Sequence, residues 1–204
     1  MRLGILLSGR GSNLKAIHDA IYHHQLPATI VAVASDVPSC EGMAWAAEAG
    51  YPTMGMSPRE FATKADFESV LCHFLMSNSV DWVILAGYMR LVGPTLLGAF
   101  TDRILNIHPS LLPLFKGLHP QQQALTAGVS ESGCTVHLVT DQLDGGPILG
   151  QRSVPVYLTD TVATLSERIL VEEHVLYPAM IRQLAMGSIT IHNGVIQIQS
   201  KESL

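Results

Sequence analysis

Short apolar runs alternate with longer amphipathic stretches along the first half of the chain. After the first apolar run, Leu14, Ile17 and Ile21 recur at helical spacing. Segments of this kind predict helices over Asn13–His24, Glu41–Gly50 and Ala65–Ser79, and the apolar runs predict buried strands over Leu3–Leu7, Thr29–Ser35, Thr53–Met56, Trp82–Ala86 and Ile104–His108. This alternation predicts an α/β fold with a Rossmann-like, mostly parallel, twisted sheet that carries helices on both faces.

The pattern changes after residue 108, where a proline-rich loop and a short helix are expected over Pro109–Gly117 and Gln121–Ala127. Only a loop separates the next two predicted strands, Cys134–Leu138 and Ile148–Val156, so an antiparallel pair is expected there. The chain then predicts a long helix over Thr161–Met186, capped by Asp160 or Thr161, and a hairpin of Ile189–His192 and Val195–Ile198 around Asn193-Gly194. The tail after Ser200 is expected to fray.

Composition bounds the size and the partners of this fold. The chain has 204 residues, of which 48% are hydrophobic, so we expect one domain over residues 1–204. The formal net charge is −5 and no basic patch stands out, which argues against a nucleic-acid partner. A phosphate ester is still compatible, because backbone N–H groups can bind it.

The same composition predicts where the protein acts. No apolar run reaches the roughly 18 residues of a membrane helix, and the apolar run at the N-terminus is too short for a signal peptide. The three cysteines, Cys40, Cys72 and Cys134, are odd in number and widely spaced. They predict neither a disulfide framework nor a zinc site, and the protein is expected to be cytoplasmic.

The turn Ser8–Asn13 lies between the first predicted strand and the first predicted helix. Glycines in such a turn point backbone N–H groups outward, and the helix dipole favours an anion there. The turn lacks the third glycine of a dinucleotide fingerprint and the Gly-Lys-Ser/Thr of a triphosphate loop. A monophosphate site is therefore the favoured interpretation, and a tight turn that binds nothing is the alternative.

Asn106 and His108 end a predicted strand two residues apart, so they face the same side of the sheet. Open α/β sheets bind ligands at the carboxyl ends of their strands. There an amide could hydrogen-bond a carbonyl oxygen and an imidazole could donate a proton. A capping Asn and a surface His would give the same pattern without chemistry.

Other polar residues are weaker candidates. Asp144, beside Gly145-Gly146-Pro147, could orient or deprotonate a group, although ordinary turn chemistry explains it equally well. His119 and His137 could be structural, and Glu173 could be a solvated acid on its helix. The His18, His23 and His24 cluster has no carboxylate or cysteine at metal-ligand spacing, so no metal site is predicted.

Five stretches, in this order, resemble the phosphoribosylglycinamide formyltransferase family: LLSGRGSNLKAI at 6–17, DWVILAGYMRLVGPTLL at 81–97, ILNIHPSLLPLFKGLH at 104–119, GCTVHLVTDQLDGGPILGQ at 133–151 and EEHVLYP at 172–178. NIHPSLLP with a later D-x-G-P motif marks the wider superfamily, and GSN with LAGYMR narrows the resemblance. It implies the formyltransferase fold and transfer of a formyl group from 10-formyltetrahydrofolate to phosphoribosylglycinamide in purine biosynthesis, without a metal. It also implies a phosphate-binding half over about residues 1–100 and a folate-binding, catalytic half over about 101–204.

Matched positions carry implied roles. Catalysis is expected at Asn106, His108 and Asp144. The phosphoribosylglycinamide site is expected at Gly11, Ser12, Asn13, Leu170, Val171, Glu172 and Glu173. The folate site is expected at Lys64, Met89, Arg90, Leu91, Val92, Thr140, Asp141, Gln142 and Leu143, together with Asn106 and Asp144. Ser110, His119 and His137 are expected to support these residues.

Some positions depart from the family. Lys64 stands where relatives often have Arg, which keeps the charge for the folate tail but loses the bidentate fork. Gln121 and Gln122 replace His and Arg of some relatives, so no role is carried over to them. Leu170 and Val171 replace polar residues, so any contact they make with substrate is expected from their backbone.

Three alternatives stay open at this point. Methionyl-tRNA formyltransferases have an additional tRNA-binding domain, and formyltetrahydrofolate hydrolases have an N-terminal regulatory domain. This short, acidic chain, with its first strand at residue 3, does not favour either. A non-catalytic folate- or nucleotide-binding module would bind both ligands without formyl transfer. Leu112-Pro113 is a candidate cis peptide bond, and a homodimer is the assembly considered.

Overall fold

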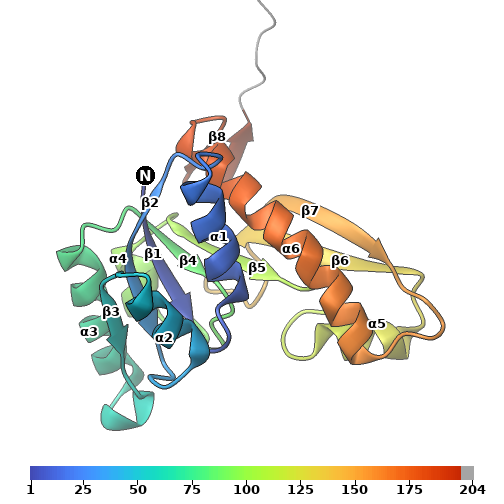
Figure 1. Cartoon of the computed structure of the whole chain (residues 1–204), viewed down its shortest axis with the longest axis horizontal. Helices are drawn as coiled ribbons and strands as arrows, with labels where there is room; N and C mark the ends of the chain where they lie inside the picture. The colour runs from blue at the N-terminus through green and yellow to red at the C-terminus, as the bar shows by residue number, and fades with distance from the viewer. Residues whose placement is uncertain (199–204) are drawn as a thin grey trace, which may run out of the picture.

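The computed structural model describes residues 1–198, and a seven-stranded sheet forms its centre (Figure 1). The strand order is β3-β2-β1-β4-β5-β6-β7. Neighbours from β3 to β5 are parallel, whereas β6 pairs antiparallel with both β5 and β7. The strands are β1 (Arg2–Leu7), β2 (Thr29–Ser35), β3 (Thr53–Gly55), β4 (Trp82–Leu85), β5 (Ile104–His108), β6 (Glu131–Leu138) and β7 (Ile148–Pro155). The chain order reverses between β1 and β4, which is where such sheets bind ligands.

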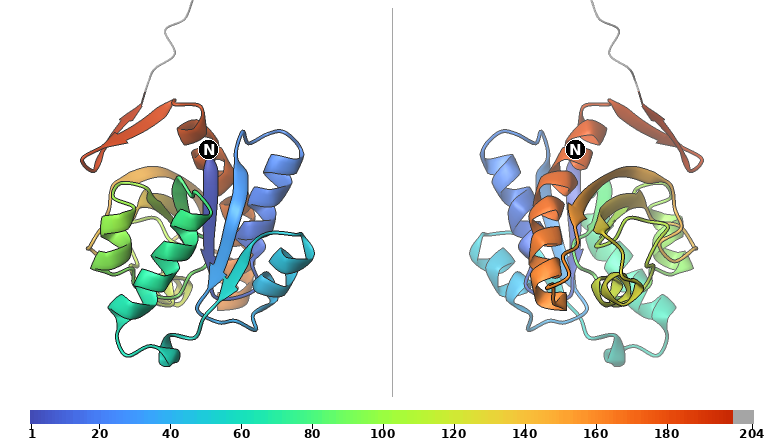
Figure 2. Two further views of the ribbon diagram at one scale, coloured as in Figure 1. Left: turned by 90° about the vertical axis from the view of Figure 1, so that its left-hand side faces the viewer. Right: turned by 90° about the vertical axis from the view of Figure 1, so that its right-hand side faces the viewer.

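Helices cover both faces of the sheet (Figure 2). One face carries α1 (Ser12–Tyr22), α2 (Glu41–Glu48), α5 (Pro120–Ala127) and α6 (Val162–Ala185), and the other carries α3 (Lys64–Ser77) and α4 (Pro94–Ala99). Side chains of β1 alternate between the two cores, with Leu3, Ile5 and Leu7 in one and Leu6 in the other. The predicted mostly parallel sheet with two covered faces is thus confirmed.

The C-terminal half also follows the prediction. The pair β6–β7 is antiparallel, and β8 (Ile189–His192) and β9 (Val195–Ile198) form a separate hairpin. Asn193 and Gly194 both have positive φ, at 51° and 72°, as a two-residue hairpin turn requires. The tail expected to fray after Ser200 lies outside the described residues. None of the helices within residues 1–198 is long and apolar enough to span a membrane.

Two short helices were missed by the pattern, namely α4 and the 3-10 helix η1 (Pro58–Glu60). Both are too short to show helical periodicity. A local signal was nevertheless present at α4, because Pro94 follows Gly93 and proline is favoured at the first position of a helix.

Candidate active site

The end of β5 brings the first predicted pair together with two side chains of β6. Asn106 pairs across the strands with His137, and His108 pairs with Thr135. Directly opposed residues of an antiparallel pair share one face of the sheet, and Asn106 and His108 share it with each other. His108, Thr135 and His137 are 6%, 0% and 2% exposed, so these polar groups meet in a nearly dry place.

His137 lies between two of the predicted residues. Its Nδ1–H donates to the Leu138 carbonyl at 2.9 Å. Its Nε2 lies 3.1 Å from Asn106 Nδ2 and 3.6 Å from Asp144 Oδ1. His137 thus lies between the amide of β5 and the carboxylate after β6, and its supporting role stays a prediction.

The loop after β5 determines which ring nitrogen of His108 carries the proton. Its Nε2–H donates to the Phe115 carbonyl at 2.9 Å, and its Nδ1 lies 3.5 Å from Asp144 Oδ2. Burial lowers the pKa of His108, and this outweighs the upward effects of the Phe115 carbonyl and the Asp144 charge. The imidazole is therefore mainly neutral near pH 7, with its proton on Nε2.

Asp144 completes the trio from a strained backbone position, because its φ is 45° in a non-glycine residue. Burial raises the pKa of Asp144, but the nearby His137 imidazole, the hydrogen bond from the Gly117 amide (2.8 Å) and the His108 imidazole bring the net pKa below its usual value. Asp144 is thus a carboxylate at neutral pH. The structure brings Asn106, His108 and Asp144 to one place; their catalytic roles remain predictions.

The loop after β5 is held by Ser110, an expected supporting residue, and by Thr135 and Gln151, which the sequence analysis missed. Thr135 Oγ1 donates to the Ser110 carbonyl at 2.7 Å and accepts from the Leu112 amide at 3.0 Å and from Gln151 Nε2 at 2.9 Å. The Ser110 hydroxyl donates to the Leu114 carbonyl at 2.6 Å. The Leu112-Pro113 bond is cis, as predicted. The signal for Thr135 was its place in an otherwise apolar strand beside His108.

The predicted phosphate turn leads into α1. Gly11 has φ 73°, and a Cβ there would lie 2.8 Å from the Gly42 Cα, so both the backbone and the space require glycine. No side chain caps α1, which begins at Ser12. The first N–H groups of an α-helix have no intrahelical partners, and here no side chain accepts from them either. They are therefore available to an anion.

Glu173 faces this turn from α6. It is 7% exposed, and Asn13 Nδ2 donates to its Oε2 at 2.8 Å. Burial raises the pKa of Glu173, and the Asn13 hydrogen bond offsets this only in part. Asn13 Oδ1 is buried without a partner. The solvated-acid interpretation of Glu173 is wrong, because the residue lies between Ile169 and Tyr177 on the buried stripe of its helix.

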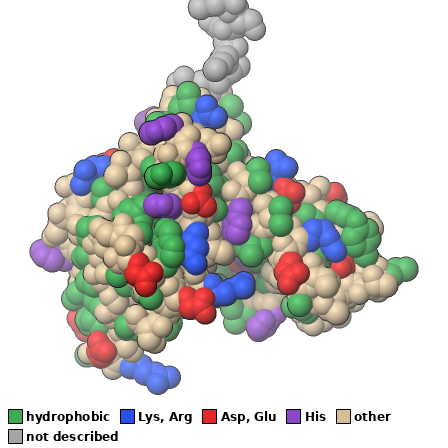
Figure 3. Space-filling view, in the orientation of Figure 1, with side chains coloured by type: hydrophobic (Ala, Val, Ile, Leu, Met, Phe, Trp, Pro, Cys, Tyr) green, Lys and Arg blue, Asp and Glu red, His purple; other side chains and the backbone are tan. Residues whose placement is uncertain are grey.

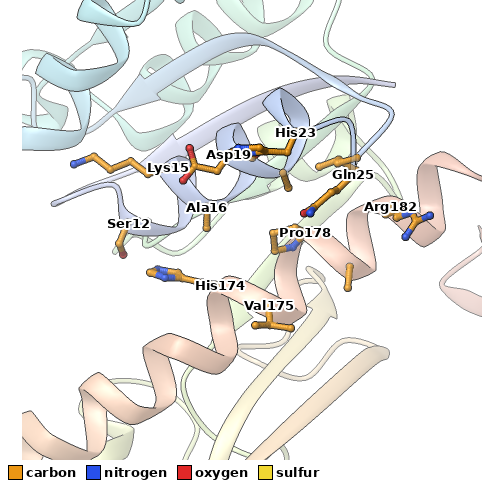
Figure 4. A pocket seen from close by; sticks show the side chains of 13 residues that line it. Ser12, Lys15, Ala16, Asp19, His23, Gln25, His174, Val175, Pro178 and Arg182 are labelled. Atoms are coloured by element: carbon orange, nitrogen blue, oxygen red, sulfur yellow. The ribbon is translucent and has the colours of Figure 1, made fainter.

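A groove of about 740 Å³ opens beside these residues, between α1 and α6 (Figure 4). Ser12, Ala16, His174 and Pro178 are among its lining residues, and Ser12 belongs to the turn as well. Acidic, basic and histidine side chains lie close together over this face of the molecule (Figure 3). The groove does not include the trio, so it adjoins the predicted phosphate end and leaves the catalytic end outside.

The other residues predicted on α6 differ in their surroundings. Leu170 is half-buried and Val171 is 61% exposed. The carboxylate of Glu172 forms an ion pair with Arg152. A partner within the chain therefore already engages that carboxylate, which leaves Glu173 as the acid that faces the turn.

The predicted folate residues fall in two loops. Lys64, Met89, Arg90 and Leu91 line a cavity of about 320 Å³, and Val92 lies half-buried beside them. The Arg90 guanidinium lies over the Phe67 ring at 5.7 Å.

In the second loop Asp141, Gln142 and Leu143 are exposed, and the Thr140 hydroxyl accepts from the Gln142 amide at 3.3 Å. His119 is exposed at the start of α5, without a side-chain capping bond, so its supporting role stays a prediction. Among residues 1–198 no group of three or more metal-ligating side chains comes together.

Comparisons with known proteins identify the family of this chain. The formyl transferase family matches residues 1–181. Phosphoribosylglycinamide formyltransferase of Escherichia coli (strain K12) is 39% identical over 192 residues, which cover 94% of this chain and 91% of that protein. The trifunctional purine biosynthetic protein adenosine-3 of Chironomus tentans is 40% identical over 194 residues, 94% of this chain, but this chain spans only 14% of that protein.

A solved structure extends the comparison to three dimensions. The crystal structure of glycinamide ribonucleotide transformylase 1 from Symbiobacterium toebii superposes with a TM-score of 0.95 at 46% identity, over 98% of this chain and 94% of the other. Family match, fold and a nearly fully covered relative agree, and the chain therefore belongs to the phosphoribosylglycinamide formyltransferase family of the formyl transferases.

Proposed function

We propose that the protein transfers the formyl group of 10-formyltetrahydrofolate to the amine of phosphoribosylglycinamide, giving formylglycinamide ribonucleotide and tetrahydrofolate. The observation that carries this proposal is the meeting of Asn106, His108 and Asp144 at the end of the sheet in a member of this family. We place the reaction in de novo purine biosynthesis; the description of the trifunctional relative names purine biosynthesis.

The trio supplies the groups that this reaction needs. When the amine adds to the formyl carbon, the carbonyl oxygen becomes negative, and the Asn106 amide donates to it. The Nε2 proton of His108 is already bonded to the Phe115 carbonyl, so His108 acts as a second donor once its Nδ1 has taken up a proton. The amine becomes cationic on addition and must lose a proton, for which Asp144, ionised at neutral pH, is the acceptor, directly or through water. Expulsion of the leaving nitrogen requires a proton in return, so the site moves protons between two nitrogens and needs no metal.

The phosphate and the ribose occupy the other end of the proposed site. The uncapped first turn of α1, with Gly11, Ser12 and Asn13, offers backbone N–H groups to the phosphate. Glu173 accepts hydrogen bonds from the ribose, and its neighbours Leu170, Val171 and Glu172 form the adjoining wall. The raised pKa of Glu173 lowers the cost of placing it near an anionic substrate.

The folate lies along two loops in this proposal. Met89–Val92 and Thr140–Asp144 contain the pterin between them, and Lys64 faces the acidic tail. Lys64 and Arg90 are cations on the cavity of about 320 Å³ that the first loop lines. In this proposal about residues 1–100 mainly bind the phosphate, and about residues 101–204 bind the folate and carry the catalytic residues, within a single domain.

One absorbance assay tests the proposal. The purified protein is mixed with 10-formyltetrahydrofolate, and deformylation is followed with and without phosphoribosylglycinamide. Turnover that depends on phosphoribosylglycinamide supports transfer. Equal turnover without it would indicate a hydrolase, and binding of both compounds without turnover would indicate a non-catalytic module.

The cellular setting is also a proposal. We propose that the protein acts in the cytoplasm on these small molecules, with neither a nucleic acid nor a membrane as a partner. A homodimer remains a prediction, and sedimentation velocity across a range of protein concentrations measures it.

A further inference from the structure

A buried carboxylate outside the trio joins the two walls of the smaller cavity. Glu68, on α3, is 3% exposed. Its Oε1 accepts from the Gly93 amide at 2.5 Å, and its Oε2 accepts from the Leu96 amide at 3.2 Å. These amides belong to the start of α4, directly after the loop Met89–Val92. Glu68 therefore fastens the end of that loop to α3.

The identity of residue 93 follows from this contact. Gly93 has φ −101° and ψ 176°, an extended conformation that any residue adopts, so the backbone itself does not require glycine. A Cβ there would lie 2.7 Å from each carboxylate oxygen of Glu68. The close approach of carboxylate and amide thus requires glycine at this position.

Glu68 also fixes Lys64, which lies one turn earlier on the same face of α3. The Lys64 ammonium lies 3.9 Å from Glu68 Oε1, and the two side chains are 44% and 4% exposed. The buried Glu68 carboxylate therefore contacts the Lys64 ammonium from inside the protein, while the exposed part of Lys64 faces the cavity. A capping box between Thr63 and Asp66 fixes the backbone at this end of α3.

We infer that Glu68 is a positioning residue for the folate site, which holds Met89–Val92 and Lys64 in place without touching the ligand. This inference rests on the proposed function. Its physical basis is that removal of a buried carboxylate leaves its two amide donors without an acceptor. Each unsatisfied buried donor costs free energy. Loosening the loop and Lys64 together weakens folate binding and leaves the trio intact.

The test is Glu68→Gln, measured by steady-state kinetics and by hydrogen exchange of the Leu91, Gly93 and Leu96 amides. The carboxamide can accept from one amide only and points its NH₂ at the other. We expect the KM for folate to rise about tenfold, with kcat and the KM for phosphoribosylglycinamide within about twofold of wild type. Exchange of the three amides should become faster.

Two further variants separate positioning from general damage. Gly93→Ala disturbs the same contact from the loop side, so its effect should not multiply with that of Glu68→Gln in the double variant. Asp102→Asn is the matched control, because Asp102 Oδ2 also accepts from a backbone amide, that of Gly194 at 3.0 Å, but in the C-terminal hairpin. It should leave the folate KM unchanged.

The outcomes decide the matter. A folate KM within about twofold of wild type despite faster exchange, or equal losses in kcat and in both KM values, would overturn the inference. If Glu68→Gln does not fold, Glu68→Asp takes its place and should raise the folate KM by a smaller factor; an unchanged KM would count against us. Absence of formyl transfer in the wild type would instead refute the proposed function, while the exchange data would still test the hold of Glu68 on the loop.

Discussion

Two carboxylates serve the two ends of the proposed site, and their pKa values move in opposite directions. Glu173 is 7% exposed and has one hydrogen-bond donor, Asn13, so burial dominates and its pKa is raised. Asp144 is less deeply buried, and the Gly117 amide and two imidazoles surround its carboxylate, so its pKa is lowered. The difference teaches that the depth of burial and the number of neighbouring donors together set the direction of the pKa shift of an acid here.

Each direction suits the role proposed for that end. An ionised Asp144 can accept a proton and orient His108 at any pH near neutrality. Glu173, which ionises less readily, places less negative charge beside a phosphate while still accepting a hydrogen bond. We propose that Asp144 serves the chemistry and Glu173 serves substrate binding because their surroundings differ.

The largest expected effect is at the catalytic end. His108→Ala should lower kcat by about 10² or more, because the protonated imidazole that stabilises the developing negative oxygen is lost, and should leave both KM values largely unchanged. His192→Ala is the control, since His192 is exposed on β8. Steady-state kinetics of both variants measure the effect. A His108→Ala variant with wild-type kcat would remove His108 from the mechanism.

A smaller but distinct effect is expected at the phosphate end. Gly11→Val should raise the KM for phosphoribosylglycinamide by about tenfold, because a side chain in the turn displaces the N–H groups that bind phosphate. Gly50→Val is the matched control: Gly50 also has positive φ, 80°, but a Cβ there meets nothing within 4 Å.

The control carries the same backbone strain, so melting temperatures of the two variants separate stability from binding. The assignment of the turn fails if the KM is unchanged in a folded Gly11→Val protein, or if Gly50→Val raises it equally.

Charge and apolar burial can be compared within the folate site. Lys64→Ala should raise the folate KM only a few-fold, and less at high salt, since Lys64 is partly exposed and an exposed ion pair is worth roughly 0–1 kcal/mol. Val139→Trp should raise it more, because Val139 is half-buried directly before the loop Thr140–Asp144, and a larger side chain there would take space proposed for the pterin. Arg59→Ala, the loss of another exposed cation, is the control. A hundredfold loss in Lys64→Ala with Val139→Trp near wild type would show that charge governs the site.

The sequence predicted the sheet and two residues of the trio for a physical reason. Apolar runs mark buried strands, and residues two apart on a strand face one way, so Asn106 and His108 were placed by local pattern alone. Asp144 lies 36 residues beyond His108, and no local rule connects the two. Only the family resemblance joined them before the structure did.

The misses have a common cause. Glu68 lies near Leu71 and Cys72 on the buried face of α3, and Glu173 lies between Ile169 and Tyr177 on that of α6. Helical periodicity could therefore have indicated that both acids point inward, although the sequence analysis did not use it so. It could not indicate what each meets there, because the partners, Gly93 and Asn13, come from other parts of the chain.

The coupling between Asp144 and His108 can be measured without turnover. The Asp144 charge raises the pKa of His108, against the larger lowering by burial. Asp144→Asn removes that charge, so the pKa of His108 should fall further below its usual value. NMR titration of the His108 ring measures this, and the exposed His192 serves as the internal control. A rise in the pKa of His108 would contradict the geometry.

The smallest effect concerns stability and should have opposite signs at the two ends. A carboxyl whose pKa is raised by folding stabilises the folded state below its unfolded pKa, and this contribution is lost as the pH rises through the folded pKa. Glu173 is such a group, so above that range the wild type bears the cost of an ionised, buried acid. Glu173→Gln removes the charge and keeps an acceptor for Asn13. It should therefore raise the melting temperature by about 2 °C near pH 8, and by less near pH 5.

Asp144→Asn should do the reverse. A carboxyl whose pKa is lowered by folding stabilises the folded state above its unfolded pKa, and this contribution is lost as the pH falls through the folded pKa. Asp144→Asn removes this contribution, so it should lower the melting temperature near pH 8 and change it less near pH 5. Calorimetry of both variants at the two pH values makes the measurement, with Glu172→Gln as the neighbouring control, because Arg152 already pairs with that carboxylate. If both variants shift the melting temperature in the same direction near pH 8, the two acids do not differ in the way their surroundings indicate.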